Sequence, residues 1–146
     1  MSVLYVAIGN PLRGDDGVAH RVLALLEPGA AKLGVHQLTP ELACEVARVE
    51  AVVFIDADVS AMEPRLEPVG EPHASPLGHA MTPEEVVYLA RGLYGFTGEA
   101  FVCRVPAEQF EGRGLSAEAE GNARVCAELI RATARAALHL RSRFQR

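Results

Sequence analysis

The sequence has no long apolar run, no surplus of basic residues and few cysteines. Its apolar runs all fall short of the roughly 20 residues that span a bilayer, and no basic segment precedes an apolar one at the N-terminus. Lys and Arg number 14 against 19 Asp and Glu, for a net charge of -5. Sequence-independent nucleic-acid binding needs a basic face, so this charge argues against it. We therefore expect a cytoplasmic protein without membrane or nucleic-acid partners.

The cysteines are too few and too widely spaced for a disulfide framework. Cys44, Cys103 and Cys126 each lie within apolar sequence. This pattern is typical of buried free thiols in a reducing compartment. We therefore expect three unpaired core cysteines.

The length and apolar content of the chain predict a single domain over residues 1–146. Domains commonly span about 100 to 200 residues, and the 49% hydrophobic content is enough for a sizeable core.

Short apolar runs alternate with segments of helical spacing along the chain. Strands are expected at 2–8, 34–38, 51–55, 64–69 and 100–105, and helices at 17–27, 40–48, from 82 and from 116 to about 140. In the last helix, Val125, Cys126, Leu129, Ile130 and Ala137 form the expected buried stripe, and the tail after 140 is expected to fray. This alternation predicts a three-layer α/β/α fold with a mostly parallel central sheet.

The loop Gly9–Gly17 carries two adjacent carboxylates, Asp15 and Asp16, between the first strand and the first helix. In such folds this position lies at the rim above the carboxyl ends of the strands, where ligands bind. One of the two acids is expected to cap the helix, which leaves the other for chemistry. The loop lacks both G-x-G-x-x-G and the Gly-Lys-Ser/Thr of a P-loop, so it does not indicate nucleotide binding.

A further acidic residue, Asp56, ends the apolar run 51–55, and a histidine, His79, precedes the helix that begins near Thr82. A carboxylate at the end of a buried strand must be paired, ligating or catalytic, since burying it alone would cost several kcal/mol. Asp58 follows in the connection and favours a turn. Aspartate with histidine suits a borderline divalent metal such as nickel or zinc.

Other common catalytic patterns are absent from the sequence. It has no H-E-x-x-H helix and no G-x-S-x-G elbow, which argues against a zinc peptidase of that type and against an acyl-enzyme hydrolase. The remaining histidines, His20, His36, His73 and His139, are expected to be solvated.

Several segments together resemble the nickel-iron hydrogenase maturation endopeptidases over nearly the full chain. They are Gly9-Asn10-x-Leu12-x-x-Asp15-Asp16-Gly17, Thr39-Pro40-Glu41-Leu42, Phe54-Ile55-Asp56-Ala57, His79 before Thr82-Pro83-Glu84-Glu85-Val86, Phe96-Thr97-Gly98, Pro106 with Phe110-Glu111, and Gly114-Leu115-Ser116. Any one piece is weak, but the set is specific.

The resemblance implies a phosphorylase/hydrolase-like fold and an endopeptidase that removes the C-terminal extension of a hydrogenase large-subunit precursor. It also implies a metal site formed by Asp16, Asp56 and His79. The nickel is implied to arrive with the precursor, although another divalent metal could occupy the site in vitro. Asp16 or Asp56 would be the general base if the site acts chemically.

Two departures from the family pattern bear on the activity. Asp16 stands where some members carry Glu, and a glycine-rich segment with an Asp is replaced by His36-Gln37-Leu38-Thr39-Pro40-Glu41, in which either His36 or Glu41 would be the substitute for that Asp. One alternative function is a non-proteolytic nickel-sensing or chaperone module for hydrogenase assembly. A weaker one is small-anion binding at the first helix, which the adjacent Asp15 and Asp16 disfavour.

Overall fold

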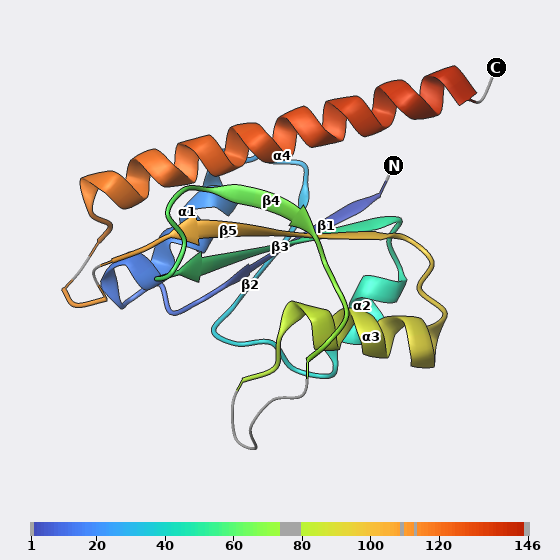
Figure 1. The fold of residues 1–146 in the computed structure, drawn as a ribbon, viewed down its shortest axis with the longest axis horizontal. Coiled ribbons are helices and arrows are strands. Elements are labelled where there is room, and N and C mark those ends of the chain that lie inside the picture. Colours follow the sequence, from blue (N-terminus) through green and yellow to red (C-terminus); the bar gives the residue numbers. More distant parts are fainter. Residues whose placement is uncertain (1, 74–79, 109, 113, 145–146) are drawn as a thin grey trace.

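The chain forms a five-stranded sheet in the order β2-β1-β3-β5-β4 (Figure 1). The structure is a computed structural model, and it describes residues 2–73, 80–108, 110–112 and 114–144. The strands are β1 (Val3–Ile8), β2 (Ala31–Val35), β3 (Ala51–Asp58), β4 (Arg65–Pro68) and β5 (Glu99–Pro106). The first three and β5 run parallel, whereas the edge strand β4 runs antiparallel to β5.

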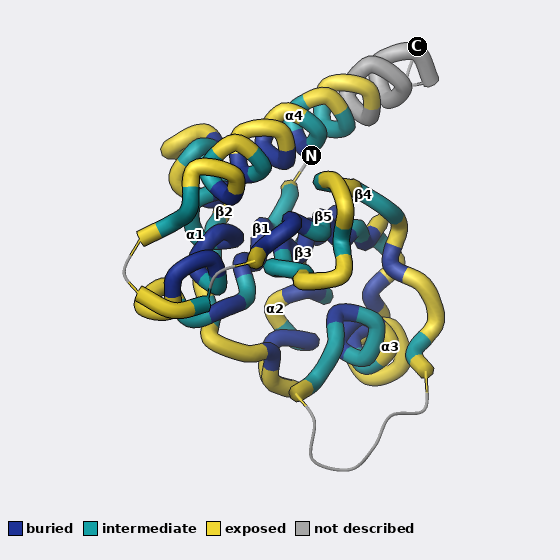
Figure 2. The backbone as a smooth tube through the Cα atoms, turned by 60° about the vertical axis from the view of Figure 1, so that its left-hand side comes forward, coloured by how far each residue is buried: buried dark blue, intermediate teal, exposed yellow. Residues whose placement is uncertain are grey.

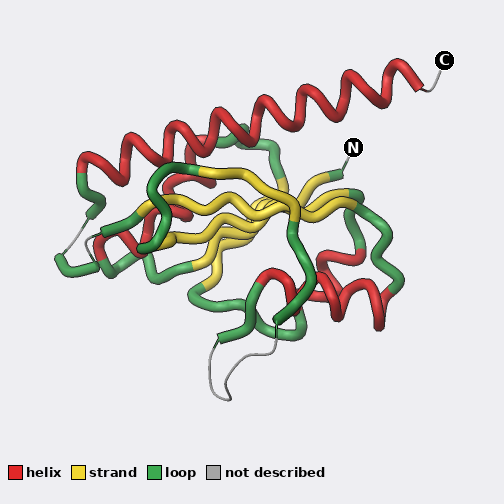
Figure 3. The backbone as a smooth tube through the Cα atoms, in the orientation of Figure 1, coloured by secondary structure: helices red, strands yellow, loops and turns green. Residues whose placement is uncertain are grey.

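Helices cover both faces of this sheet (Figure 3). They are the 3-10 turn η1 (Gly14–Gly17), α1 (Val18–Leu25), α2 (Leu42–Ala47), α3 (Pro83–Tyr94) and α4 (Ala117–Phe144). One apolar cluster joins the sheet to α1 and α4, and a second joins it to α2 and α3. The predicted three-layer α/β/α fold with a mostly parallel sheet is confirmed.

The central strand β3 explains why the two clusters lie on opposite faces. Val53 and Ile55 belong to the α1/α4 cluster, whereas Val52 and Phe54 belong to the α2/α3 cluster. Successive side chains of a strand point to opposite faces, so a strand covered on both sides must be apolar at every position. Figure 2 shows this buried centre in dark blue.

Helix α3 begins with the capping box that Thr82-Pro83-Glu84-Glu85 predicts. The Glu85 amide donates to Thr82 Oγ1 at 3.2 Å, and the Thr82 amide donates to Glu85 Oε1 at 3.0 Å. Both bonds satisfy amides that a helix start leaves unpaired, which fixes where α3 begins.

Several predicted boundaries are wrong by a few residues. Strand β2 begins at Ala31 rather than 34, and α2 begins at Leu42 because residues 39–41 form turns instead. Helix α4 continues to Phe144 where a frayed tail was expected.

The predicted buried stripe of α4 needs one correction. Val125 is 48% exposed, since Ala123, Cys126, Ala127 and Ile130 form the side of the helix that packs on the sheet. The side chain of Ala137 lies outside the described part of the chain.

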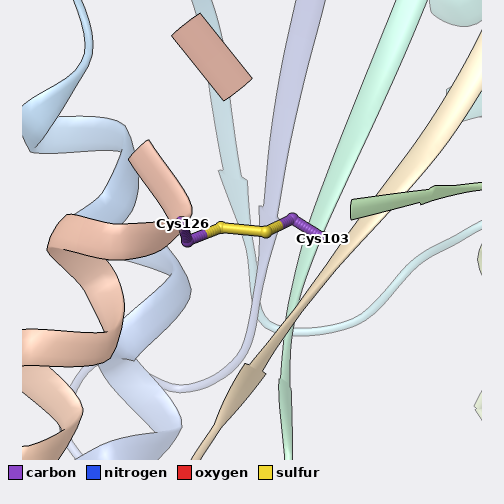
Figure 4. The surroundings of a disulfide bond; sticks show 2 residues. All are labelled: Cys103 and Cys126. Atoms are coloured by element: carbon purple, nitrogen blue, oxygen red, sulfur yellow. A yellow bond between two sulfur atoms is a disulfide. The ribbon is translucent and has the colours of Figure 1, made fainter. Parts of the chain in front are cut away.

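The prediction of three free cysteines is wrong for two of them. Cys103 in β5 and Cys126 in α4 form a disulfide, with an S–S distance of 2.06 Å (Figure 4). Both are fully buried, as expected, but packing of α4 on β5 brings their Cα atoms to 6.7 Å from each other. Cys44 in α2 is free and half-buried. The spacing of the cysteines in the sequence does not indicate this pairing, because it depends on how α4 packs on β5.

Within the described ranges, no helix combines the length and the apolar character needed to cross a bilayer.

Candidate functional site

The candidate site lies at the carboxyl ends of β1 and β3, where the order in which the chain adds strands to the sheet reverses. From β1 the chain passes through α1 to β2, and from β2 it crosses through α2 to β3 on the other side of β1. Neighbouring parallel strands with such diverging connections leave a crevice at their carboxyl ends, where α/β sheets bind ligands. Asp16 follows β1 and Asp56 lies near the end of β3, so both predicted carboxylates belong to this edge.

Asp16 lies half-buried in η1, in a tightly closed loop. Its Oδ2 accepts a hydrogen bond from the Asn10 amide at 2.8 Å. Gly9 has φ +139°, and a Cβ at this position would lie 2.1 Å from the Asp16 carbonyl oxygen. Only glycine permits both this backbone angle and this close approach, so Gly9 is required for the fold of the loop that holds Asp16.

Asp56 lies on the α2/α3 face of the sheet, next to Phe54 in the alternation of β3. The strand register pairs it with Ile8 of β1 and Arg104 of β5. Burial raises the pKa of Asp56 to about 6, with further increases from the charges of Asp58, Asp16 and Glu84, while Arg104 acts in the opposite direction. Asp16 is thus one of the charges that act on Asp56, and both candidate acids lie at the same edge of the sheet.

Arg104 links three elements around Asp56. Its Nε donates to Glu67 Oε1 of β4 at 3.0 Å, and its Nη2 lies 3.4 Å from Glu84 Oε1 in the first turn of α3. This residue was not among the predicted site residues. The sequence did contain a signal for it, because Arg104 is a charged residue within the otherwise apolar strand segment Phe101–Val105. In the sheet it pairs with Asp56, near the end of the other predicted strand.

Asp15 has a structural role, and the prediction that one of the adjacent acids caps α1 is wrong. Neither side chain caps that helix, whose N-cap is Gly17. Asp15 is 1% exposed and accepts from the Glu108 amide at 3.1 Å and from the Ser116 amide at 2.9 Å. The Ser116 hydroxyl also donates to it and accepts from the Ala119 amide, which makes Ser116 the predicted cap of α4. Asp15 therefore ties η1 to the connection between β5 and α4.

His20 of α1 is half-buried and bonded, contrary to the expectation that it is solvated. Its Nε2 lies 2.7 Å from the Gly9 carbonyl oxygen. Because a carbonyl only accepts, Nε2 carries the proton and donates. The helix folds back over the loop, a contact that the polar side of a helical pattern does not reveal.

Three further polar residues lie along the same sheet edge. Asp58 accepts from the amide and hydroxyl of Ser60, at 2.8 and 2.7 Å, so the predicted turn role is confirmed, although β3 extends through it. His36 directly follows β2 and is exposed. Glu41 is also exposed, and bonds from its own amide and the Thr39 hydroxyl lower its pKa.

The third predicted ligand, His79, lies outside the described residues. Among the residues that are described, no group of three or more His, Cys, Asp or Glu side chains could hold a metal ion. Asp16 and Asp56 at this edge supply carboxylate oxygens, which are donors that divalent cations bind.

Sequence comparison and structure comparison give different results. No protein-family model matches the chain, and no curated protein is similar to it in sequence. The structure is similar to the hydrogenase maturating endopeptidase HybD from E. coli, with a TM-score of 0.71 and 19% identity over 94% of each chain. It is also similar to the NiFe hydrogenase maturation protease HybD from Thermococcus kodakarensis, with a TM-score of 0.70 and 22% identity over 91% of this chain and 99% of that one.

A third match is the NiFe hydrogenase maturation protease HycI from Thermococcus kodakarensis KOD1, with a TM-score of 0.64 and 20% identity over 88% of this chain and 89% of that one. Over most of its length, this chain has the fold of the hydrogenase maturation endopeptidases.

Proposed function

We propose that this chain, as one domain over residues 1–146, is a cytoplasmic endopeptidase that removes the C-terminal extension of a nickel-loaded hydrogenase large-subunit precursor. One observation carries the proposal: two carboxylates, Asp16 after β1 and Asp56 near the end of β3, lie at the carboxyl ends of neighbouring parallel strands, at the β1/β3 switch point. The fold shared with maturation endopeptidases supports it. The sequence segments that resemble this family, including the one around His79, support it further.

Nickel belongs to the substrate in this proposal. Asp16, Asp56 and His79 would recognise it, so that only a loaded precursor presents its tail to the site. Both carboxylates are oxygen donors of negative charge, and histidine would add the nitrogen donor that nickel favours. A bound cation would supply charge that offsets the repulsion between the two acids.

Asp56 is the residue we assign to proton transfer. Peptide hydrolysis forms a bond from water oxygen to the carbonyl carbon, breaks the C–N bond and delivers a proton to the leaving amine. Without a cation, burial raises the pKa of Asp56 to about 6, and an Asp56 oxygen that does not contact the nickel would take the proton from water and return it to the amine. Asp16 is held at Oδ2 by the Asn10 amide, and we assign its Oδ1 to the substrate.

The test is incubation of the purified protein with a nickel-iron hydrogenase large-subunit precursor from the same organism, with and without nickel. Shortening of the C-terminus, measured by intact mass, should require nickel. Asp16→Asn, Asp56→Asn and His79→Ala should each reduce processing at least a hundredfold while leaving the circular dichroism spectrum unchanged. His73→Ala, in the same connection as His79, is the matched control and should process normally. Full activity of His79→Ala would refute the proposed site.

The alternative is a nickel-sensing or chaperone module that cleaves nothing. It is favoured by His36, which follows β2 where the resembling proteases often carry an aspartate segment. Nickel-dependent binding of the precursor through His79 without any change in its mass would support this alternative and exclude proteolysis.

A further inference from the structure

The peptide group between Gly9 and Asn10 is bonded on both sides. Its carbonyl oxygen accepts from His20 Nε2 at 2.7 Å, and its N–H donates to Asp16 Oδ2 at 2.8 Å. One planar peptide therefore connects a histidine of α1 to a carboxylate of the candidate site. The preceding amide, that of Gly9, donates to the Val35 carbonyl oxygen at 3.0 Å, so β2 also holds this peptide in place.

Such a chain of hydrogen bonds is cooperative. A donor on the carbonyl oxygen polarises the peptide and makes its N–H a stronger donor. The acceptor here is a carboxylate, so the Asn10 bond is charge-assisted and sensitive to that polarisation. His20 thereby acts on Asp16 without touching it.

The absence of a side chain at Gly34 leaves space for the His20 ring. Gly34 of β2 lies against the imidazole, and a Cβ at Gly34 would come within 2.8 Å of Nδ1 and 3.0 Å of Cε1. Gly34 has no unusual backbone angle, so the space above it, rather than its conformation, is what the ring requires. Gly34 thus permits the ring position from which His20 bonds to the Gly9 carbonyl oxygen.

We propose that His20 is a positioning residue that orients the Asp16 carboxylate through the Gly9–Asn10 peptide. The bond to Oδ2 fixes the rotation of the carboxyl group, which leaves Oδ1 to face the substrate. The hydrogen-bond part of this inference rests on the geometry of the loop alone. Its consequence for metal recognition rests on the proposed function.

The experiment compares His20→Phe, which keeps a ring but removes the donor, with His20→Gln, whose amide nitrogen can donate from a similar position. The first readout is the Asn10 amide resonance in a ¹⁵N-labelled sample. We expect it to move upfield in His20→Phe and to return toward its original position in His20→Gln. Gly34→Ala, which displaces the ring without deleting it, should produce the same upfield shift.

The second readout is titration with Ni²⁺ alone. Loss of an outer-shell partner typically weakens metal binding about 10- to 100-fold, so His20→Phe should bind at least tenfold more weakly, with recovery in His20→Gln. Arg21→Ala is the matched control, because it removes a contact of α1 with Glu120 of α4 at 2.9 Å and leaves the Gly9 loop intact. It should alter neither readout.

The outcomes separate this inference from the proposed function. An Asn10 resonance that is unchanged in both His20→Phe and Gly34→Ala would overturn the positioning role. A shifted resonance together with no Ni²⁺ binding in any variant, the unmodified protein included, would keep the hydrogen-bond relay and count against metal recognition.

Discussion

At the scale of single residues, two adjacent acids have opposite roles. Asp15 is buried and satisfied by donors from the β5–α4 connection, whereas Asp16 is half-buried and accepts a bond from the Asn10 amide of its own loop. The two residues are neighbours in sequence, but their burial and their hydrogen-bond partners differ. We therefore assign a structural role to Asp15 and a role in the candidate site to Asp16.

This contrast predicts different effects of the two alanine substitutions. Asp15→Ala should lower the free energy of unfolding by about 3 kcal/mol, because it leaves the Glu108 and Ser116 amides without their acceptor. Asp16→Ala should cost about 1 kcal/mol or less but abolish processing, since it loses one partly exposed bond. Urea unfolding and the precursor assay measure the two effects. Equal destabilisation would contradict the assignment.

Asp56 should make the protein less stable as the pH rises. Its folded pKa is about 6 against an ordinary 3.8, because of burial first and neighbouring carboxylates second. The folded state therefore binds more protons than the unfolded state between these values, and the stability that Asp56 contributes below about pH 4 is lost as the pH rises through about 6.

Replacing Asp56 with Asn should remove this loss. At pH 7 to 8 the variant should be more stable than the unmodified protein by about 1–3 kcal/mol, and near pH 4 the two should be similar. Urea unfolding at several pH values tests this, with Asp58→Asn as the control because the pKa of Asp58 is lowered rather than raised. An Asp56→Asn variant that is less stable at pH 8 would show that the carboxylate is favourably paired in solution.

At the scale of elements, the start of α3 is defined by a complete capping box. The capping box fixes Thr82 and Glu85, and Glu84 of the same turn lies beside Arg104 of β5. Local hydrogen bonds thus set where the helix begins, and the Glu84–Arg104 ion pair connects that helix start to β5, the strand that neighbours Asp56.

Thr82→Ala should therefore destabilise the protein by about 1 kcal/mol, the usual cost of losing a helix cap. Thr82→Ser should remain close to the unmodified protein because serine keeps the oxygen that accepts from the Glu85 amide. Chemical unfolding of the two variants at pH 7 provides the comparison. If the serine variant lost as much stability as the alanine variant, the cap would not be the cause.

At the scale of the whole molecule, the disulfide joins strand β5 to the long last helix. Cys103 and Cys126 are separated by 23 residues and packed in the α1/α4 cluster. Closing a loop of this length restricts the unfolded chain, which in the loop-entropy model is worth about 3 kcal/mol.

Reduction should accordingly lower the free energy of unfolding by about 3 kcal/mol. Urea unfolding with and without a reductant measures it, in a Cys44→Ala background so that the free thiol of α2 cannot exchange with the bridge. The Cys44→Ala protein before reduction is the reference. Identical unfolding midpoints in both conditions would contradict a stabilising bridge.

Much of the fold could be predicted from the sequence, and so could the placement of two candidate site residues at one sheet edge. The run 51–55 is apolar without interruption because β3 is covered on both faces, and the capping box is a local pattern of four residues. Both patterns can be recognised within a short segment of the sequence. The same holds for placing Asp16 and Asp56 at one edge, since parallel strands align their carboxyl ends.

Other features were decided only by tertiary structure, because each depends on residues distant in sequence. Packing of α4 on β5 created the Cys103–Cys126 bridge, and the return of α1 over the Gly9 loop bonded His20. Register placed Arg104 beside Asp56. The sequence by itself thus determined the order of elements and the loops that carry the acids, through periodicity and local hydrogen bonding. Only the folded chain decided which acid is buried, which cysteines pair and which side chains surround the site, because those outcomes require long-range contacts.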